Sequence, residues 1–146
     1  MSTTPQLRWD DHMDGQDWPT LSAFYAEAGM GHKPPEALHT VFDHSLFKCR
    51  VWDGERLVAV GRVLADGADC AYLCDIAVAP SHQGLGLGKA VVTRLLALSQ
   101  GHKKIILYAM PGKEGFYRRL GFLPMATAMA IFSDPEAAQA RGLLRP

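Results

Sequence analysis

Residues 73–89 have the sequence LCDIAVAPSHQGLGLGK, the most informative stretch of the chain. Its first half is a nearly continuous apolar run that ends at Pro80, which is typical of a buried strand. A glycine-rich turn follows at once, and residues 90–99 then carry apolar side chains at helical spacing. This order of elements directs free backbone N–H groups and the positive end of a helix toward one point. The sequence therefore predicts an anion site here, suited to the pyrophosphate of a cofactor.

The spacing of the glycines excludes two common nucleotide motifs. The nucleotide-binding P-loop needs G-x-x-x-x-G-K-[ST], but Gln83 stands where its first glycine should be and Ala90 follows Lys89. The dinucleotide fingerprint needs G-x-G-x-x-G, whereas residues 84–88 give G-x-G-x-G. A different phosphorylated cofactor is therefore expected.

The pattern Q/R-x-x-G-x-G/A does fit, as QGLGLG at residues 83–88, and it resembles the acetyl-CoA pyrophosphate loop of the GNAT N-acetyltransferase superfamily. The strand at 72–78 with Pro80 is similar to the strand that precedes this loop in the family, and 105–109 to the next one. Residues 115–122, GFYRRLGF, resemble the family's F-Y-x-x-x-G-F signature. Roughly residues 56–132 follow the family pattern in the right order.

This resemblance implies an α/β fold, with a mixed central sheet flanked by helices and a splayed strand pair that forms the acetyl-CoA site. Residues 1–146 would form a single N-acetyltransferase domain. Acetyl-CoA, the co-substrate, would contact the backbone of the strand and of the loop, together with the tyrosine of the signature. The implied contact residues are Ile76, Ala77, Val78, Gln83, Gly84, Leu85, Gly86, Leu87, Gly88, Lys89 and Tyr117.

Two residues are candidates for catalysis. The resemblance implies that Tyr117 is the acid that protonates the departing thiolate, although an aromatic core residue is the alternative interpretation. Asp75 interrupts the apolar run, and a carboxylate in a buried strand is costly unless it is paired or used. It is a candidate base for the acceptor amine, and a structural carboxylate paired with an arginine or holding a bulge is the alternative. His82 and His102 are weaker base candidates, and we expect both to be solvent-exposed loop residues.

Composition limits the class of protein. The chain has 146 residues, long enough for one sizeable core, and a formal net charge of +0 argues against a nucleic-acid partner. No apolar run approaches the roughly 20 residues that span a bilayer, and the first residues lack a signal-peptide core. We expect a cytoplasmic protein without a membrane or nucleic-acid partner and without a metal. The three cysteines are interpreted as small buried hydrophobic residues.

Other elements are expected from local signals. Trp18, Phe24 and Tyr25 belong to a helix that starts at residues 17–19, where they line an acceptor pocket or pack in the core. The remaining expected elements are strands at 6–10, 46–52, 57–64 and 126–132, a hairpin turn at Asp53-Gly54, and helices at 35–43, at 113–120 and after 133–136.

The function that this pattern predicts is acetyl transfer from acetyl-CoA to a primary amine of a small molecule, directly within a ternary complex. A protein lysine or N-terminal acetyltransferase and a non-catalytic acyl-CoA-binding module are the alternatives. A homodimer through the last strand or the terminal helix is a further expectation.

Overall fold

The computed structural model describes residues 6–146, which form two compact units. The first unit extends to Leu107 and the second is Tyr108–Pro146. No helix within the described residues is long and apolar enough to cross a bilayer. The prediction that residues 1–146 form one N-acetyltransferase domain stays a prediction.

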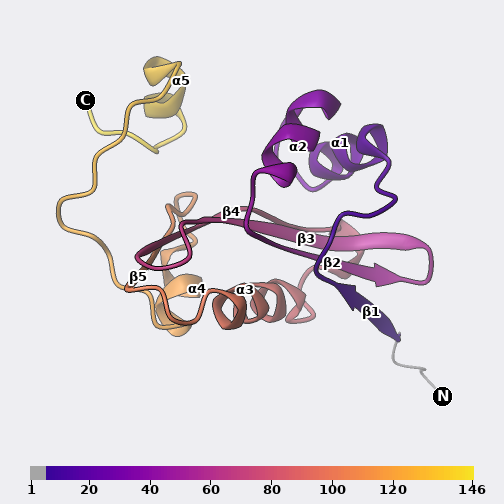
Figure 1. The fold of residues 1–146 in the computed structure, drawn as a ribbon. Coiled ribbons are helices and arrows are strands. Elements are labelled where there is room, and N and C mark those ends of the chain that lie inside the picture. Colours follow the sequence, from indigo (N-terminus) through magenta and orange to yellow (C-terminus); the bar gives the residue numbers. More distant parts are fainter. Residues whose placement is uncertain (1–5) are drawn as a thin grey trace. The chain divides into compact units, whose positions relative to one another are not determined.

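A mixed five-stranded sheet forms the centre of the first unit (Figure 1). Its strands follow chain order across the sheet: β1 (Leu7–Asp10), β2 (Phe47–Asp53), β3 (Arg56–Ala65), β4 (Cys70–Val78) and β5 (Lys104–Ile106). The first four are antiparallel to their neighbours, and β5 is parallel to β4. The mixed sheet is the one that the family resemblance implies.

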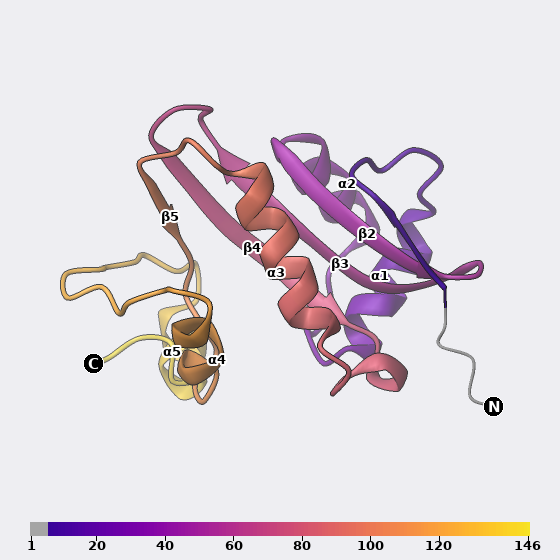
Figure 2. The same cartoon turned by 90° about the horizontal axis from the view of Figure 1, so that it is seen from below.

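Three helices cover the two faces of this sheet. The helices α1 (Trp18–Glu27) and α2 (Pro35–Asp43) lie on one face, and α3 (Leu87–Leu98) lies on the other (Figures 1 and 2). Asp17 caps α1 by accepting from the Thr20 N–H, and Pro19 occupies the first turn, as the sequence indicates. The buried helix residues that pack on the sheet are Leu21, Phe24, Tyr25, Leu38, Phe42, Leu87, Val91, Val92 and Leu95.

Gly61 lets α3 approach β3 closely. A Cβ atom built on this glycine would lie 2.9 Å from Leu95 Cδ1 and 3.2 Å from Val91 Cγ1. A side chain there would overpack the interface between sheet and helix. The glycine therefore fixes the depth at which α3 sits on the strands that carry the candidate site.

A buried ion pair joins the edge strand to the sheet. The Arg50 Nε atom donates to Asp10 Oδ1 at 2.8 Å, and Trp52 Nε1 donates to Asp10 Oδ2 at 3.0 Å. Both charged side chains are almost fully buried. Removing one partner of such a pair leaves an uncompensated buried charge, so the pair ties β1 firmly to β2.

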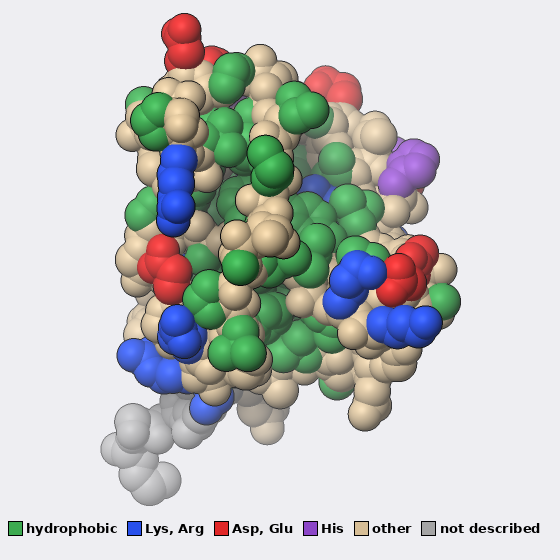
Figure 3. Space-filling view, turned by 90° about the vertical axis from the view of Figure 1, so that its left-hand side faces the viewer, with side chains coloured by type: hydrophobic (Ala, Val, Ile, Leu, Met, Phe, Trp, Pro, Cys, Tyr) green, Lys and Arg blue, Asp and Glu red, His purple; other side chains and the backbone are tan. Residues whose placement is uncertain are grey.

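The second unit contains two short helices, α4 (Glu114–Arg119) and α5 (Pro135–Ala140). Asp134 caps α5 by accepting from the Ala137 N–H, in agreement with the sequence. The strand expected at 126–132 is wrong, because this segment has no regular structure and no strand lies in this unit to pair with it. Met129 and Ile131 are fully exposed, and hydrophobic side chains cover much of the face drawn in Figure 3.

The other predicted elements differ from the structure only at their ends. The predicted helix at 90–99 begins three residues earlier, because Gly86 already ends the loop. The strand expected at 105–109 stops at Ile106, and the turn after β2 is formed by Gly54 and Glu55. The helix at 35–43 agrees with the structure.

Candidate active site

The glycine-rich loop opens the start of α3 to solvent. Gly84 and Gly86 adopt left-handed φ angles of 78° and 81°, a conformation that favours glycine. A Cβ atom at either position would meet no atom within 4 Å. Gly86 is the N-cap of α3 and supplies no side-chain cap, so the first N–H groups of the helix have no capping side chain. An anion could approach the backbone here without steric hindrance, which fits a pyrophosphate.

Side chains on either end hold this loop in place. His82 Nε2 lies 2.8 Å from Asp53 Oδ2 at the end of β2. Gln83 Nε2 donates to the Val78 carbonyl at 3.0 Å, so this side chain links the loop to the last residue of β4. His82 is therefore half-buried and paired rather than a solvent-exposed histidine, which corrects the expectation from sequence.

The strand β4 leaves the edge next to β5 open over most of its length. Within residues 6–146, β5 pairs with β4 only at Cys70, Ala71 and Tyr72, whereas β4 continues to Val78. On its other side β4 stays paired with β3 up to Val78. The pairing stops because β5 itself ends at Ile106, so within residues 6–107 no strand pairs with this edge of β4 beyond Tyr72. The splayed strand pair that the resemblance implies stays a prediction.

A bulge at Asp75 interrupts the pairing of β4 with β3. The register moves from Arg62↔Cys74 to Val60↔Ala77, so two residues of β4 oppose Gly61 alone. Asp75 has a φ angle of 53°, the only positive value among the non-glycine residues described. The Tyr25 hydroxyl, buried in α1, donates to the Asp75 carbonyl at 2.7 Å. The bulge is thus held from the α1 side of the sheet.

The Asp75 carboxylate is clamped by two cations. Arg62 Nε donates to Oδ2 at 2.8 Å, and Lys33 Nζ lies 3.1 Å from Oδ1. Burial raises the pKa of this carboxyl, but the charges of Arg62 and Lys33 and their hydrogen bonds outweigh burial, so the pKa of Asp75 lies below its ordinary value. A carboxylate of this kind is ionised near neutral pH and is a weak proton acceptor. The geometry supports the structural alternative, and the role of Asp75 as base stays a prediction.

Replacing Asp75 with asparagine should destabilise the fold by about 3 kcal/mol near neutral pH, because it leaves Arg62 with an uncompensated charge. Since the folded pKa is lowered, the carboxylate stabilises the fold above its unfolded pKa of about 3.9, and this contribution is lost as the pH falls through the folded pKa. Urea unfolding across pH should therefore show a gap between variant and parent that closes below about pH 4.

Asp69→Asn is the matched control for this prediction. Asp69 pairs with Lys104 at 3.0 Å, but both side chains are about half exposed. Its removal should cost less than about 1 kcal/mol. Equal losses for the two variants would show that the clamp on Asp75 contributes no more than a surface pair.

Tyr117 lies in the second unit, on α4. Its ring contacts Phe116 and Phe122 edge-on, at centroid distances of 5.0 Å and 5.8 Å. Burial raises the pKa of its hydroxyl, so Tyr117 keeps its proton through the neutral range. A protonated phenol can donate to a departing thiolate, and the acid role of Tyr117 stays a prediction.

Two of the three cysteines, Cys49 and Cys74, are poor nucleophiles. Burial raises the pKa of Cys49 to about 12 and that of Cys74 to about 11. Because the thiolate is the reactive form, these thiols stay protonated near neutral pH. Cys49 is buried as expected, whereas Cys70 and Cys74 are partly exposed, which corrects the expectation for these two.

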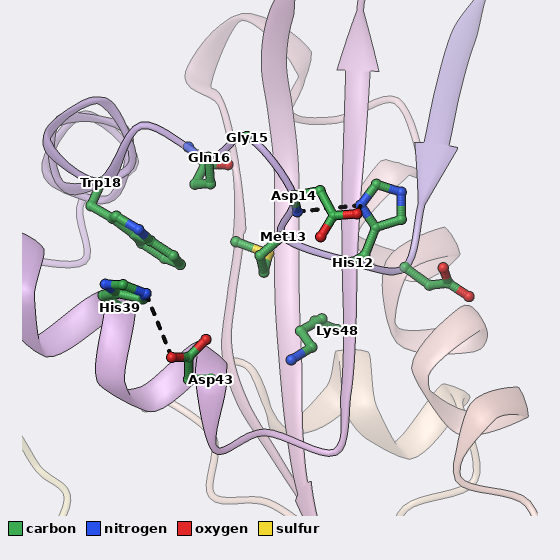
Figure 4. Close-up of a pocket in the computed structure, with 10 residues that line it drawn as sticks. His12, Met13, Asp14, Gly15, Gln16, Trp18, His39, Asp43 and Lys48 are labelled. Carbon is green, nitrogen blue, oxygen red and sulfur yellow. Dashed lines mark hydrogen bonds and ion pairs between the residues drawn. The ribbon is translucent and has the colours of Figure 1, made fainter.

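A polar hollow of about 400 Å³ lies beside α1 and α2 (Figure 4). The Trp18 ring stacks on His39 at 4.6 Å, and His39 Nε2 lies 3.5 Å from Asp43 Oδ2. Of the aromatic residues suggested for an acceptor pocket, only Trp18 lines this hollow, whereas Phe24 and Tyr25 are buried in the core. The hollow includes none of the predicted catalytic or cofactor residues.

The sequence was also compared with models of known protein families. A model of the acetyltransferase (GNAT) family matches residues 6–122. The chain belongs to the GNAT family. The match includes the loop, the strand before it and Tyr117, so it confirms the resemblance drawn from the motifs.

Individual relatives also support membership of this chain in the GNAT family. It is 39% identical to serotonin N-acetyltransferase 2, chloroplastic, of Oryza sativa subsp. japonica over 117 residues, which are 74% of this chain and 57% of that protein. It is 32% identical to GCN5-related N-acetyltransferase 1, chloroplastic, of Arabidopsis thaliana over 136 residues, 90% of this chain and 64% of that protein. The chain thus spans about three fifths of the length of these relatives.

A solved structure confirms the fold. The GNAT family acetyltransferase of Streptococcus pneumoniae superimposes with a TM-score of 0.75 at 22% identity, over 88% of this chain and 98% of the other. The expected α/β GNAT fold with a mixed sheet is therefore correct.

Proposed function

We propose that this GNAT protein transfers the acetyl group of acetyl-CoA to a primary amine of a small molecule, directly within a ternary complex. Two features of the first unit carry the proposal, and both offer backbone groups without a partner in a neighbouring strand or a capping side chain. One is the uncapped glycine loop at the start of α3, and the other is the edge of β4 beyond Tyr72. Together they suit a ligand with a pyrophosphate at one end and amide groups along its length.

The residues present would hold acetyl-CoA through the backbone. The N–H groups of residues 84–89 would donate to the pyrophosphate, and backbone groups of Ile76 and Val78 would bind the amides of the pantetheine arm. When bound, acetyl-CoA supplies a thioester that an amine can attack. Tyr117 would donate a proton to the thiolate that leaves, and Asp75 would orient the amine or accept its proton.

The first acceptor to test is an aromatic ethylamine. The relative with 39% identity is named for serotonin, a primary amine on an indole. The acceptor is proposed to be a small molecule of this chemical class. The alternatives of a protein acceptor or of a binding module without catalysis are outcomes of the assay described below.

Thermal unfolding with added ligands tests cofactor binding. Acetyl-CoA or CoA at 100 times its dissociation constant should stabilise the protein by about 2.7 kcal/mol, which raises Tm by a few degrees. NAD and ATP should give no shift, because neither nucleotide motif is present. A response to NAD or ATP alone would overturn the proposal.

Release of free thiol from acetyl-CoA then tests transfer. Serotonin, a polyamine, an amino sugar and a lysine-containing peptide should be compared at equal concentration. Turnover with small amines supports the proposal, whereas turnover with the peptide alone assigns a protein acceptor. Binding of acetyl-CoA without turnover on any amine would favour a binding module.

Cytoplasmic location and a homodimer stay predictions, and the two relatives named above are called chloroplastic.

A further inference from the structure

The chain places one of its own primary amines on the candidate base. Lys33 belongs to the segment 28–34 between α1 and α2, and its Nζ atom lies 3.1 Å from Asp75 Oδ1. The same atom lies 5.6 Å from the centre of the Tyr25 ring, which provides a cation–π contact. The Lys33 side chain is 27% exposed to solvent, so it is partly buried but still accessible.

The backbone of this segment holds the amine in place. The Ser22 hydroxyl donates to the Lys33 carbonyl at 2.5 Å, which anchors the segment to α1. Gly29 and Gly31 both have left-handed φ angles and lie in a stretch without regular structure. A nucleophile that the fold already holds beside a site needs no separate binding step before it reacts.

Asp75 immediately precedes Ile76, where the open edge of β4 is proposed to bind the pantetheine arm. An acceptor amine oriented by Asp75 would need the carboxylate oxygen that Lys33 Nζ now contacts. The Lys33 amine therefore lies where the acceptor amine is expected. It contacts Asp75 of β4, the strand that is proposed to bind the thioester arm. The Arg62 guanidinium on the other carboxylate oxygen cannot play this part, because it is not a nucleophilic amine.

We propose that Lys33 is a site of self-acetylation, a modification that rests on the proposed use of acetyl-CoA. A bond forms between Lys33 Nζ and the carbonyl carbon of the thioester, and the carbon–sulfur bond breaks. The ammonium group gives up two protons: one converts the departing thiolate to a thiol, and the other passes to solvent. No oxidant or reductant takes part. The product is a neutral amide, so the ion pair with Asp75 is lost and Arg62 alone pairs with the carboxylate.

Mass spectrometry of the whole chain tests this inference. The purified protein is incubated with acetyl-CoA that carries a deuterated acetyl group, so that label acquired in the tube is told apart from earlier acetylation. One label per chain should accumulate, and peptide mapping should place it on Lys33. The rate should not change when the protein is diluted, because the transfer takes place within one molecule.

Lys33→Arg and Lys48→Arg are the matched variants. Lys48 is also half-buried, and its Nζ atom donates to the Phe42 carbonyl at 2.8 Å and not to a candidate base. Both arginine variants keep the positive charge and should fold. Lys33→Arg should abolish the single label, and Lys48→Arg should leave it. In the parent chain, labelling of Lys33 should exceed that of Lys48 by at least about tenfold, because only Lys33 is positioned for attack.

Two results would overturn the inference. Equal labelling of Lys33 in the native and the urea-unfolded chain would show simple chemical reactivity, and labels confined to other lysines would show a different acceptor. If acetyl-CoA raises Tm and external amines are acetylated while Lys33 stays unlabelled, the inference fails and the proposed function stands. If acetyl-CoA neither raises Tm nor labels the chain, both fail.

Discussion

Replacing Gly86 with valine should weaken acetyl-CoA binding by at least about 100-fold. The space beside Gly86 is open, and a branched side chain would fill it where the phosphate oxygens must approach the loop. Loss of two hydrogen bonds to a charged group, at about 1.5 to 3 kcal/mol each, accounts for this factor. Isothermal titration with acetyl-CoA and with CoA measures it directly.

Backbone strain must be separated from loss of the site. Gly86 has a φ angle of 81°, so valine there is strained whatever the space around it. Gly67 has a φ angle of 86° in the turn between β3 and β4, and it also has open space beside it. Gly67→Val should therefore lower Tm by a similar amount and leave acetyl-CoA affinity unchanged. Tight binding by a folded Gly86→Val variant would remove the loop from the proposed site.

Local sequence signals predicted the part of the fold that carries the loop. An apolar run, a proline, three alternating glycines and a helical stripe specify a strand, a turn and a helix through short-range geometry. Residues 126–132, ATAMAIF, are apolar at every position except Thr127 and carry an equally local signal, yet no strand forms there. A strand needs a neighbour for its backbone groups, and the sequence of one segment does not say whether that neighbour is present.

The partners of the charged residues could not be predicted in the same way. Asp75 was recognisable as a carboxylate that must be paired or used, but Arg62 and Lys33 come from β3 and from the segment before α2. Asp10 and Arg50 are 40 positions apart and meet only because β1 pairs with β2. Such pairs depend on strand register, which the tertiary fold sets. The clamp on the bulge, and with it the place of Lys33, therefore became visible only in the structure.

Replacing Tyr117 with phenylalanine should lower kcat by about 100-fold, the usual contribution of a general acid. Phenylalanine keeps the edge-on contacts with Phe116 and Phe122, so α4 should fold as before and Tm should change little. The raised pKa of Tyr117 means that its hydroxyl carries the proton at the pH of the assay. The measurement is turnover of acetyl-CoA with the best amine of the panel, together with the dissociation constant for CoA.

The changes in kcat, in kcat/KM and in the dissociation constant for CoA show together which role Tyr117 has. A group that acts on the departing thiolate alone affects the transition state, so kcat and kcat/KM should fall together while the dissociation constant for CoA stays the same. Tyr108→Phe removes a hydroxyl from a more exposed tyrosine of the same unit, and turnover should not change. A Tyr117→Phe variant with full turnover would assign the ring to packing in the second unit. Weaker CoA binding with kcat retained would make the hydroxyl a binding group, and the acid would then have to be water or another side chain.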